Sequence, residues 1–128
     1  MTQKLSADQV RQIEEIQAYQ RVADRLKHLV TELEANRAGQ TRVIQQLCEK
    51  IAHETSQMRQ RALSSGIGTI ADVAGAMSVM AGRGGGVLLK IRGLADGVNS
   101  LQIQLEAALS HARTPQEPKS PPQPKKPA

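Results

Sequence analysis

The sequence predicts an all-α protein, and three observations lead to that prediction. Apolar residues recur at alternating steps of three and four over most of the chain, which is the spacing of one helix face. The 128 residues contain no Trp, no Phe and one Tyr, and a core of Leu, Ile, Val, Ala and Met suits helices better than sheets. A Pro-rich segment then ends the pattern. We expect long amphipathic helices that form an antiparallel helical hairpin or bundle, or a coiled coil, with a disordered C-terminal tail.

The start of the first helix is marked by a capping box. After an N-terminal extension over residues 1–5, the motif S-x-x-Q allows the Ser6 side chain to accept the Gln9 amide hydrogen. The Gln9 side chain can reach back to the Ser6 amide in return. Leu5 and Val10 stand at the positions of a hydrophobic staple on either side of this cap. These residues predict a helix that begins near Ser6.

An apolar stripe runs through residues 6–63 with a repeat of 3.5 residues, which is typical of a coiled coil or an antiparallel bundle. We therefore expect a long amphipathic helix over this range. The stripe consists of Ile16, Tyr19, Ala23, Leu26, Val30, Leu33, Ile44, Leu47, Ile51 and Met58.

The apolar phase fails at Arg37 and Gln40, within residues 36–41, and this gap leaves two alternatives open. In the first, the helix continues and the two polar residues form a layer that sets register. In the second, Gly39 adopts the left-handed conformation and Thr41 caps a new helix, which gives a hairpin. We favour the continuous or merely kinked helix, because the phase of the stripe is preserved across the gap.

Residues 64–113 form a second unit, a helical pair with a glycine hinge. Its stripe keeps phase across the segment Gly82–Gly86, and so many glycines make one uninterrupted helix unfavourable by roughly 1 kcal/mol each relative to Ala. We expect two arms, over 67–81 and 87–112, whose stripe consists of Ile70, Val73, Met77, Met80, Val87, Ile91, Leu94, Val98, Leu101 and Leu105. Small residues that recur every four positions predict close packing of helix backbones. The predicted hinge and close-packing residues are Ala74, Ser78, Gly82, Gly84, Gly85, Gly86, Gly93 and Gly97.

The segment 114–128 contains all six prolines of the chain, and it offers nothing apolar to bury. This composition predicts a disordered, basic tail with a polyproline II bias. The net charge of the whole chain is +5, with an excess of three cations over residues 37–63. Such an excess permits weak contact with nucleic acid or anionic lipid and requires neither.

The sequence offers no constellation that predicts catalysis, a cofactor or a metal. The histidines, His28, His53 and His111, fall on different predicted segments, and none has a second ligand or a nucleophile at helical spacing. Cys48 has no base placed beside it by the sequence. The glycine cluster lacks the Gly-Lys-Ser/Thr ending of a phosphate-binding loop. We expect a protein that is not an enzyme and that has no catalytic, cofactor-binding or metal-binding residues and no small-molecule substrate.

Three functional hypotheses remain. The first is a structural or adaptor protein that self-assembles, or binds a helical partner, through its heptad stripes. The second is a membrane-active protein whose segment 66–109 inserts into a bilayer or lies on it. The third is a basic protein that binds nucleic acid weakly and without sequence specificity. A lone cysteine and no visible cleavable signal peptide indicate the cytoplasm or another reducing compartment, with membrane association left open.

A long amphipathic helix ahead of a Gly/Ala-rich hydrophobic hairpin is similar in outline to apolipoprotein-L-type proteins and to type III secretion translocators. A helical body with a Pro/Lys/Ala tail is similar in outline to phasins. The chain has no motif specific to any of these groups. No residue role follows from these similarities.

Overall fold

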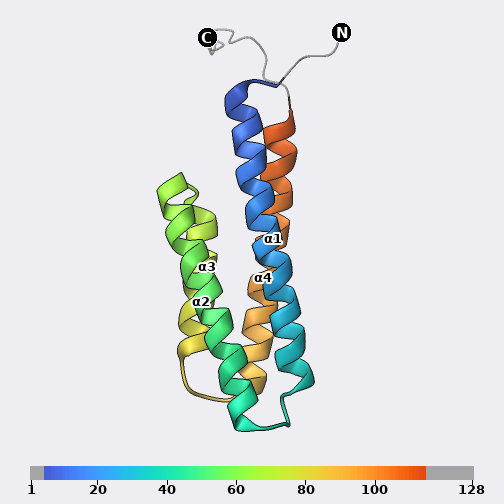
Figure 1. Cartoon of the computed structure of the whole chain (residues 1–128), viewed down its shortest axis with the longest axis vertical. Helices are drawn as coiled ribbons and strands as arrows, with labels where there is room; N and C mark the ends of the chain where they lie inside the picture. The colour runs from blue at the N-terminus through green and yellow to red at the C-terminus, as the bar shows by residue number, and fades with distance from the viewer. Residues whose placement is uncertain (1–4, 115–128) are drawn as a thin grey trace, which may run out of the picture.

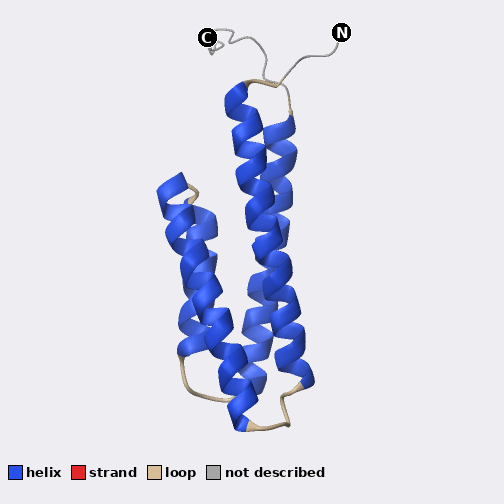
Figure 2. Cartoon of the chain, viewed as in Figure 1, coloured by secondary structure: helices blue, strands red, loops and turns tan. Residues whose placement is uncertain are grey.

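A computed structural model describes residues 5–114, and over this range the chain forms four helices. They are α1 (Ala7–Ala35), α2 (Thr41–Ser65), α3 (Gly68–Gly82) and α4 (Val87–Arg113), as Figure 1 shows. Between residues 5 and 114 there is no strand (Figure 2). The predicted all-α class and its helical bundle are therefore confirmed, while the predicted tail lies almost wholly outside the described residues.

The helices form a ring in which each is packed against its neighbours in the chain and α4 returns to α1. Figure 1 shows the long pair α1–α4 with the shorter pair α2–α3 beside its lower part. The turns α1–α2 and α3–α4 lie at the lower end, whereas α1 begins and α4 ends at the upper end. Because the pattern is up-down-up-down, short connections suffice throughout.

Both predicted stripes line the inside of this ring. All their members are buried except Ile44, Val73, Met80 and Val87, which are partly buried against the core. Each fully buried Leu, Ile or Met side chain contributes roughly 1.5–3 kcal/mol relative to its exposed state. The largest fully buried apolar side chains are Tyr19, Leu26, Leu33, Ile51, Ile70, Met77, Leu94, Leu101 and Leu105.

The capping box at the start of α1 is present. The Gln9 backbone N–H donates to Ser6 Oγ at 3.1 Å, and the Ser6 N–H donates to Gln9 Oε1 at 2.9 Å. The two residues at the staple positions bury less apolar surface than the pattern suggests, because Val10 remains 43% exposed and Leu5 is half-buried. The cap therefore depends on the hydrogen bonds more than on apolar contact.

The expected continuous helix over 6–63 is wrong, because α1 ends at Ala35 and α2 begins at Thr41. The alternative, a hairpin with a turn near Gly39, has the correct topology, but the expected conformation of Gly39 and the expected cap at Thr41 are wrong. Gly39 keeps a φ outside the left-handed region, and Gln40, without a side-chain hydrogen bond, is the N-cap of α2. The physical reason for the turn is burial: a straight helix would leave the stripes of both halves in solvent, whereas the hairpin packs them together.

The other two turns depend on glycines with positive φ. Gly66 has φ +77° and forms a Schellman motif, in which the Ile67 N–H donates to Ala62 O at 2.8 Å and the Gly66 N–H to Leu63 O at 3.2 Å. Gly85, with φ +124°, allows the chain to reverse between α3 and α4. The predicted arms 67–81 and 87–112 differ from α3 and α4 by one residue at most at each end.

The Schellman turn can be tested with Gly66→Ala. The position has open space around it, so the cost is backbone strain alone, about 1–2 kcal/mol of unfolding free energy for a left-handed Ala. Urea denaturation followed by circular dichroism measures it. Gly68→Ala is the matched control, because this glycine also has open space but begins a helix, where Ala is neutral or stabilising. Equal stability of the two variants would contradict the assignment.

Candidate functional site

A polar cluster joins α1 to the end of α2. The Arg61 guanidinium binds the Glu15 carboxylate in two places, with Nε to Oε2 at 3.0 Å and Nη2 to Oε1 at 2.9 Å. The Ser65 hydroxyl donates to Glu15 Oε2 at 2.9 Å and also lies 3.2 Å from the Tyr19 hydroxyl. Arg61 lies over the Tyr19 ring, 5.3 Å from its centroid. The side chain of Tyr19 is fully buried, and its hydroxyl group lies beside the ion pair of Glu15 and Arg61 through Ser65.

The electrostatics of this cluster favour fixed charges. The Arg61 hydrogen bond lowers the pKa of Glu15 to about 2, against the opposing effect of burial. The hydrogen bonds that Arg61 donates to Glu15 raise the pKa of Arg61, and burial raises the pKa of Tyr19. Near neutral pH the carboxylate therefore stays ionised and the phenol stays protonated. We interpret the cluster as a clamp between helices, because none of these groups titrates where general acid–base catalysis would need it.

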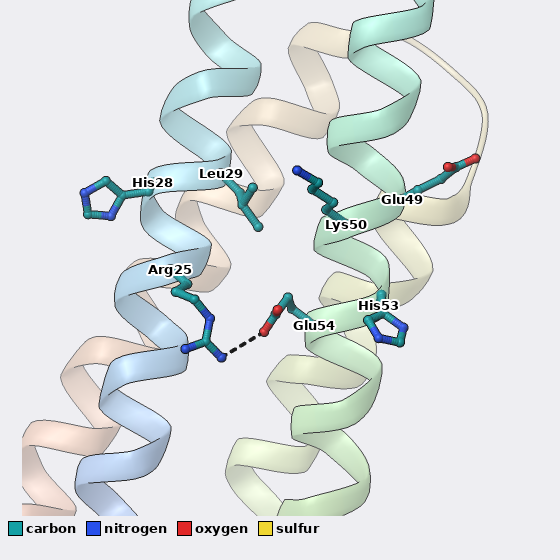
Figure 3. A pocket seen from close by; sticks show the side chains of 7 residues that line it. All are labelled: Arg25, His28, Leu29, Glu49, Lys50, His53 and Glu54. Carbon is teal, nitrogen blue, oxygen red and sulfur yellow. Dashed lines mark hydrogen bonds and ion pairs between the residues drawn. The ribbon is translucent and has the colours of Figure 1, made fainter.

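A groove of about 580 Å³ lies between α1 and α2 on their outer side. Arg25 and Glu54 bridge it with an ion pair of 3.2 Å, as Figure 3 shows. His28 on α1 and His53 and Glu49 on α2 also line the groove, but in the same view His28 points away from the two side chains on α2. The histidines therefore do not converge on one point. Within residues 5–114, no three His, Cys, Asp or Glu side chains are grouped so as to hold a metal ion.

The predicted assembly stripe is placed in the core of the chain itself. Its side chains contact the other helices of the same bundle, so the surface that was expected to receive a partner is not accessible in this conformation. Cys48, at the edge of the stripe, is a free thiol that is 5% exposed. Any association through the stripe must therefore replace contacts that the monomer already makes.

Two of the predicted close-packing glycines receive methionines from the facing helix. A Cβ at Gly97 would lie 2.6 Å from Met77 Cγ, and a Cβ at Gly93 would overlap the Met80 sulfur. Gly93 and Gly97 are one turn apart on α4, so together they form a notch that α3 fills with two side chains. This notch lets the two helices approach closely although methionine is a large residue.

The rest of the predicted small-residue set divides into two groups. Ala74 is fully buried, and the Ser78 hydroxyl donates to Ala52 O of α2 at 3.3 Å. By contrast, the close packing expected at Gly82 and Gly86 is wrong, because a Cβ at either would meet nothing within 4 Å, whereas the expected hinge is present, since Gly82–Gly86 connect α3 to α4. The reason is that α3 ends at Gly82, so the four-residue ridge leaves the helix before it can meet another backbone.

The sequence patterns do not predict two contacts that join different helices. The Gln9 side chain, 6% exposed, donates through Nε2 to Thr114 O at 2.9 Å and to Ala112 O at 3.4 Å. It thereby caps the end of α4 as well as the start of α1. Gly75 provides room for the Arg59 side chain, which lies 3.0 Å from a Cβ placed there. The capping box was a signal for Gln9, but nothing in the sequence pairs it with residues a hundred positions away.

Comparison with known proteins returned no match among family models, curated proteins or solved structures. A separate finding concerns membranes: none of the four described helices combines the length and the apolar character needed to cross a bilayer.

The clamp predicts a pH dependence that Glu15→Gln removes. Because the folded pKa of Glu15 lies below its ordinary value of 4.5, its contribution to stability is complete above that value and is lost as the pH falls towards 2. We expect the variant to lose on the order of 1 kcal/mol at neutral pH, since Glu15 and Arg61 are both partly exposed, and to match the parent near pH 2.

Urea denaturation between about pH 2 and pH 7 measures this difference. Glu14→Gln is the matched control, because this neighbouring side chain is exposed and forms no salt bridge within residues 5–114. If Glu15→Gln were as stable as the parent protein at neutral pH, the clamp would contribute nothing.

The notch predicts that Gly97→Ala is destabilising by about 1–3 kcal/mol, as expected for overpacking. The reason is that Met77 is 1% exposed and its Cγ, near the root of the side chain, blocks the new methyl group. Gly93→Ala should cost less, because Met80 is partly buried and the nearest atoms belong to the end of its side chain. Thermal unfolding ranks the two, and the reverse order would show that the notch is not rigid.

Proposed function

We propose that this chain is a non-enzymatic helical assembly protein, which self-associates through its heptad stripes by exchanging helices between copies. The observation that carries the proposal is that the stripes are buried inside the monomer while their phase is preserved across residues 36–40. A second copy can therefore use them only if one of the turns opens, and we assign this opening to the α1–α2 turn. An adaptor role, in which a helix of another protein replaces α1 or α2, would use the same opening.

The α1–α2 turn has features that support such an exchange. It contains no residue with positive φ, whereas the turns after α2 and α3 contain Gly66 and Gly85 in that region. Its backbone is held by the Gly39 N–H to Asn36 O bond of 2.8 Å, and α2 begins without a side-chain cap. Little conformational strain thus opposes a change from turn to helix.

In the exchanged dimer, α1 and α2 of each chain would form one helix over residues 7–65, about 90 Å long at 1.5 Å per residue. The spacing of its stripe would continue from Leu33 to Ile44, with Arg37 and Gln40 as a polar layer between them. The two halves would pack against the helices of the other copy and bury the same side chains as in the monomer. The equilibrium would then depend on the turn and on protein concentration, because the core contacts are equal in both states.

Two substitutions at the turn should shift the equilibrium in opposite directions. Gly39→Ala favours helix by about 1 kcal/mol per chain, which raises the dimerisation constant on the order of 30-fold for two chains. Thr41→Pro should abolish the dimer. Proline suits the first position of α2, because the preceding Gln40 has φ −72° and ψ 135°, but it disrupts a continuous helix.

Light scattering and small-angle scattering across a range of protein concentrations measure the mass and the length of the particle. Gly68→Ala is the matched control, because it raises helix propensity at a residue away from the turn and should leave association unchanged. A protein that stays monomeric in all four forms would contradict the proposal. So would a dimer that Thr41→Pro leaves intact, because it would have to use another surface.

A further inference from the structure

We propose that the turn between α3 and α4 is a docking site for an anionic membrane surface. The site consists of residues 79–92 and is called the α3–α4 tip below. Two of its side chains, Leu88 and Leu89, are 65% and 73% exposed, and Val79 on the other side of the turn is 59% exposed. Single exposed leucines are common on proteins, but two adjacent ones beside a side-chain-free turn are not explained by packing in the bundle.

The charge around these apolar side chains has one sign. Residues 73–95 contain Arg83, Lys90 and Arg92 and no Asp or Glu. Arg83 and Arg92 are exposed, and Lys90 is half-buried. The upper end of the bundle differs, because its first turns on α1 carry both signs, with Arg11 and Asp8 in an ion pair of 3.8 Å. The tip therefore combines exposed apolar groups with a net positive charge, and the nearest acidic residues along the chain, Asp72 and Asp96, lie outside it.

The α1–α2 turn lies at the same end of the bundle (Figure 1) and leaves this net charge unchanged. It contributes Arg37 and Arg42, both exposed, while Glu32 and Glu34 at the end of α1 offset them. These two carboxylates belong to α1 and not to the tip itself. Because these two carboxylates cancel Arg37 and Arg42, the net positive charge at this end of the bundle comes from the tip.

The glycines of the tip make no close contact with the rest of the protein. A Cβ placed at Gly82, Gly84, Gly85 or Gly86 would meet no atom within 4 Å. The turn therefore neither fills space in the core nor supports another helix, and its glycines leave the leucines of α4 unshielded by larger side chains. Such a segment can enter the headgroup region without disturbing the bundle.

Charge complementarity favours lipid over a second copy at this site. Two tips that met face to face would bring six cations together with no acidic residue from residues 73–95 to neutralise them. An anionic surface instead gains about 1 kcal/mol for each Lys or Arg that comes near it. The apolar side chains add to this when they enter the boundary between headgroups and acyl chains. No described helix could cross the bilayer, so the contact we infer is peripheral.

Flotation with vesicles tests the proposal, with roughly one-third phosphatidylserine in one arm and phosphatidylcholine alone in the other. At about 50 mM salt we expect binding to the anionic vesicles at least about tenfold stronger than to the neutral ones, and weaker binding as salt is raised. Leu88→Ser with Leu89→Ser should reduce binding about tenfold, and Arg83→Glu with Arg92→Glu should abolish the preference for anionic lipid.

Ile103→Ser is the matched control, because this side chain is 59% exposed on α4 but lies more than three turns from the tip. All substituted side chains are exposed, and circular dichroism verifies that the bundle is retained. Absence of binding to anionic vesicles at low salt would overturn the proposal, as would an equal loss in Ile103→Ser. Self-association that the leucine variant removes, without lipid binding, would instead identify the tip as a contact between copies.

The lipid site does not depend on helix exchange, and Thr41→Pro keeps the two proposals separable. If exchange is correct and lipid docking is also correct, this monomeric variant still binds vesicles. Loss of vesicle binding in Thr41→Pro alone would contradict the tip as a site complete within one chain.

Discussion

Burial of the two heptad stripes against each other is the constraint from which the other features of the bundle follow. The chain has one Tyr and no larger aromatic residue, so nearly all of its apolar surface is spread evenly along the helices. A surface of that kind can be removed from water only by pairing it along its whole length. Three turns are needed for this within one chain, and the clamp of Glu15 and Arg61 and the Gln9 bridge then secure the ends at which the helices would separate.

The elements predicted well from the sequence are those determined by neighbouring residues. The capping box at Ser6, the glycine turn at 82–86 and the two arms around it depend on contacts of a few positions along the chain. The prediction of a continuous helix across residues 36–40 is wrong because the local signal, a preserved phase, is the same for one long helix and for a hairpin. Burial decides between them, and burial depends on residues far away in sequence. The same applies to the notch, since no pattern states that Met77 faces Gly97.

The candidate site could be predicted only as a set of residue types. Periodicity identifies the residues of the stripes. It does not show whether these residues contact the same chain or another chain, because that depends on the topology. The sequence also does not predict that Leu88 and Leu89 are exposed. Both are next to the apolar stripe along the chain, and a wider stripe would bury them. It follows from the orientation of α4, in which Ile91 and Leu94 face the core and the two leucines of its first turn do not.

The two proposals use opposite properties of one sequence. Helix exchange depends on side chains that are buried in the monomer and on a turn with little strain to hold it, so it is slow and sensitive to concentration. Membrane docking depends on side chains that the same packing leaves in solvent, so it needs no opening of the bundle. Because both turns at the lower end are involved, a membrane bound at the α3–α4 tip would lie close to the α1–α2 turn. Docking would then concentrate copies on a surface where exchange between them becomes more frequent, which links the two activities through geometry alone.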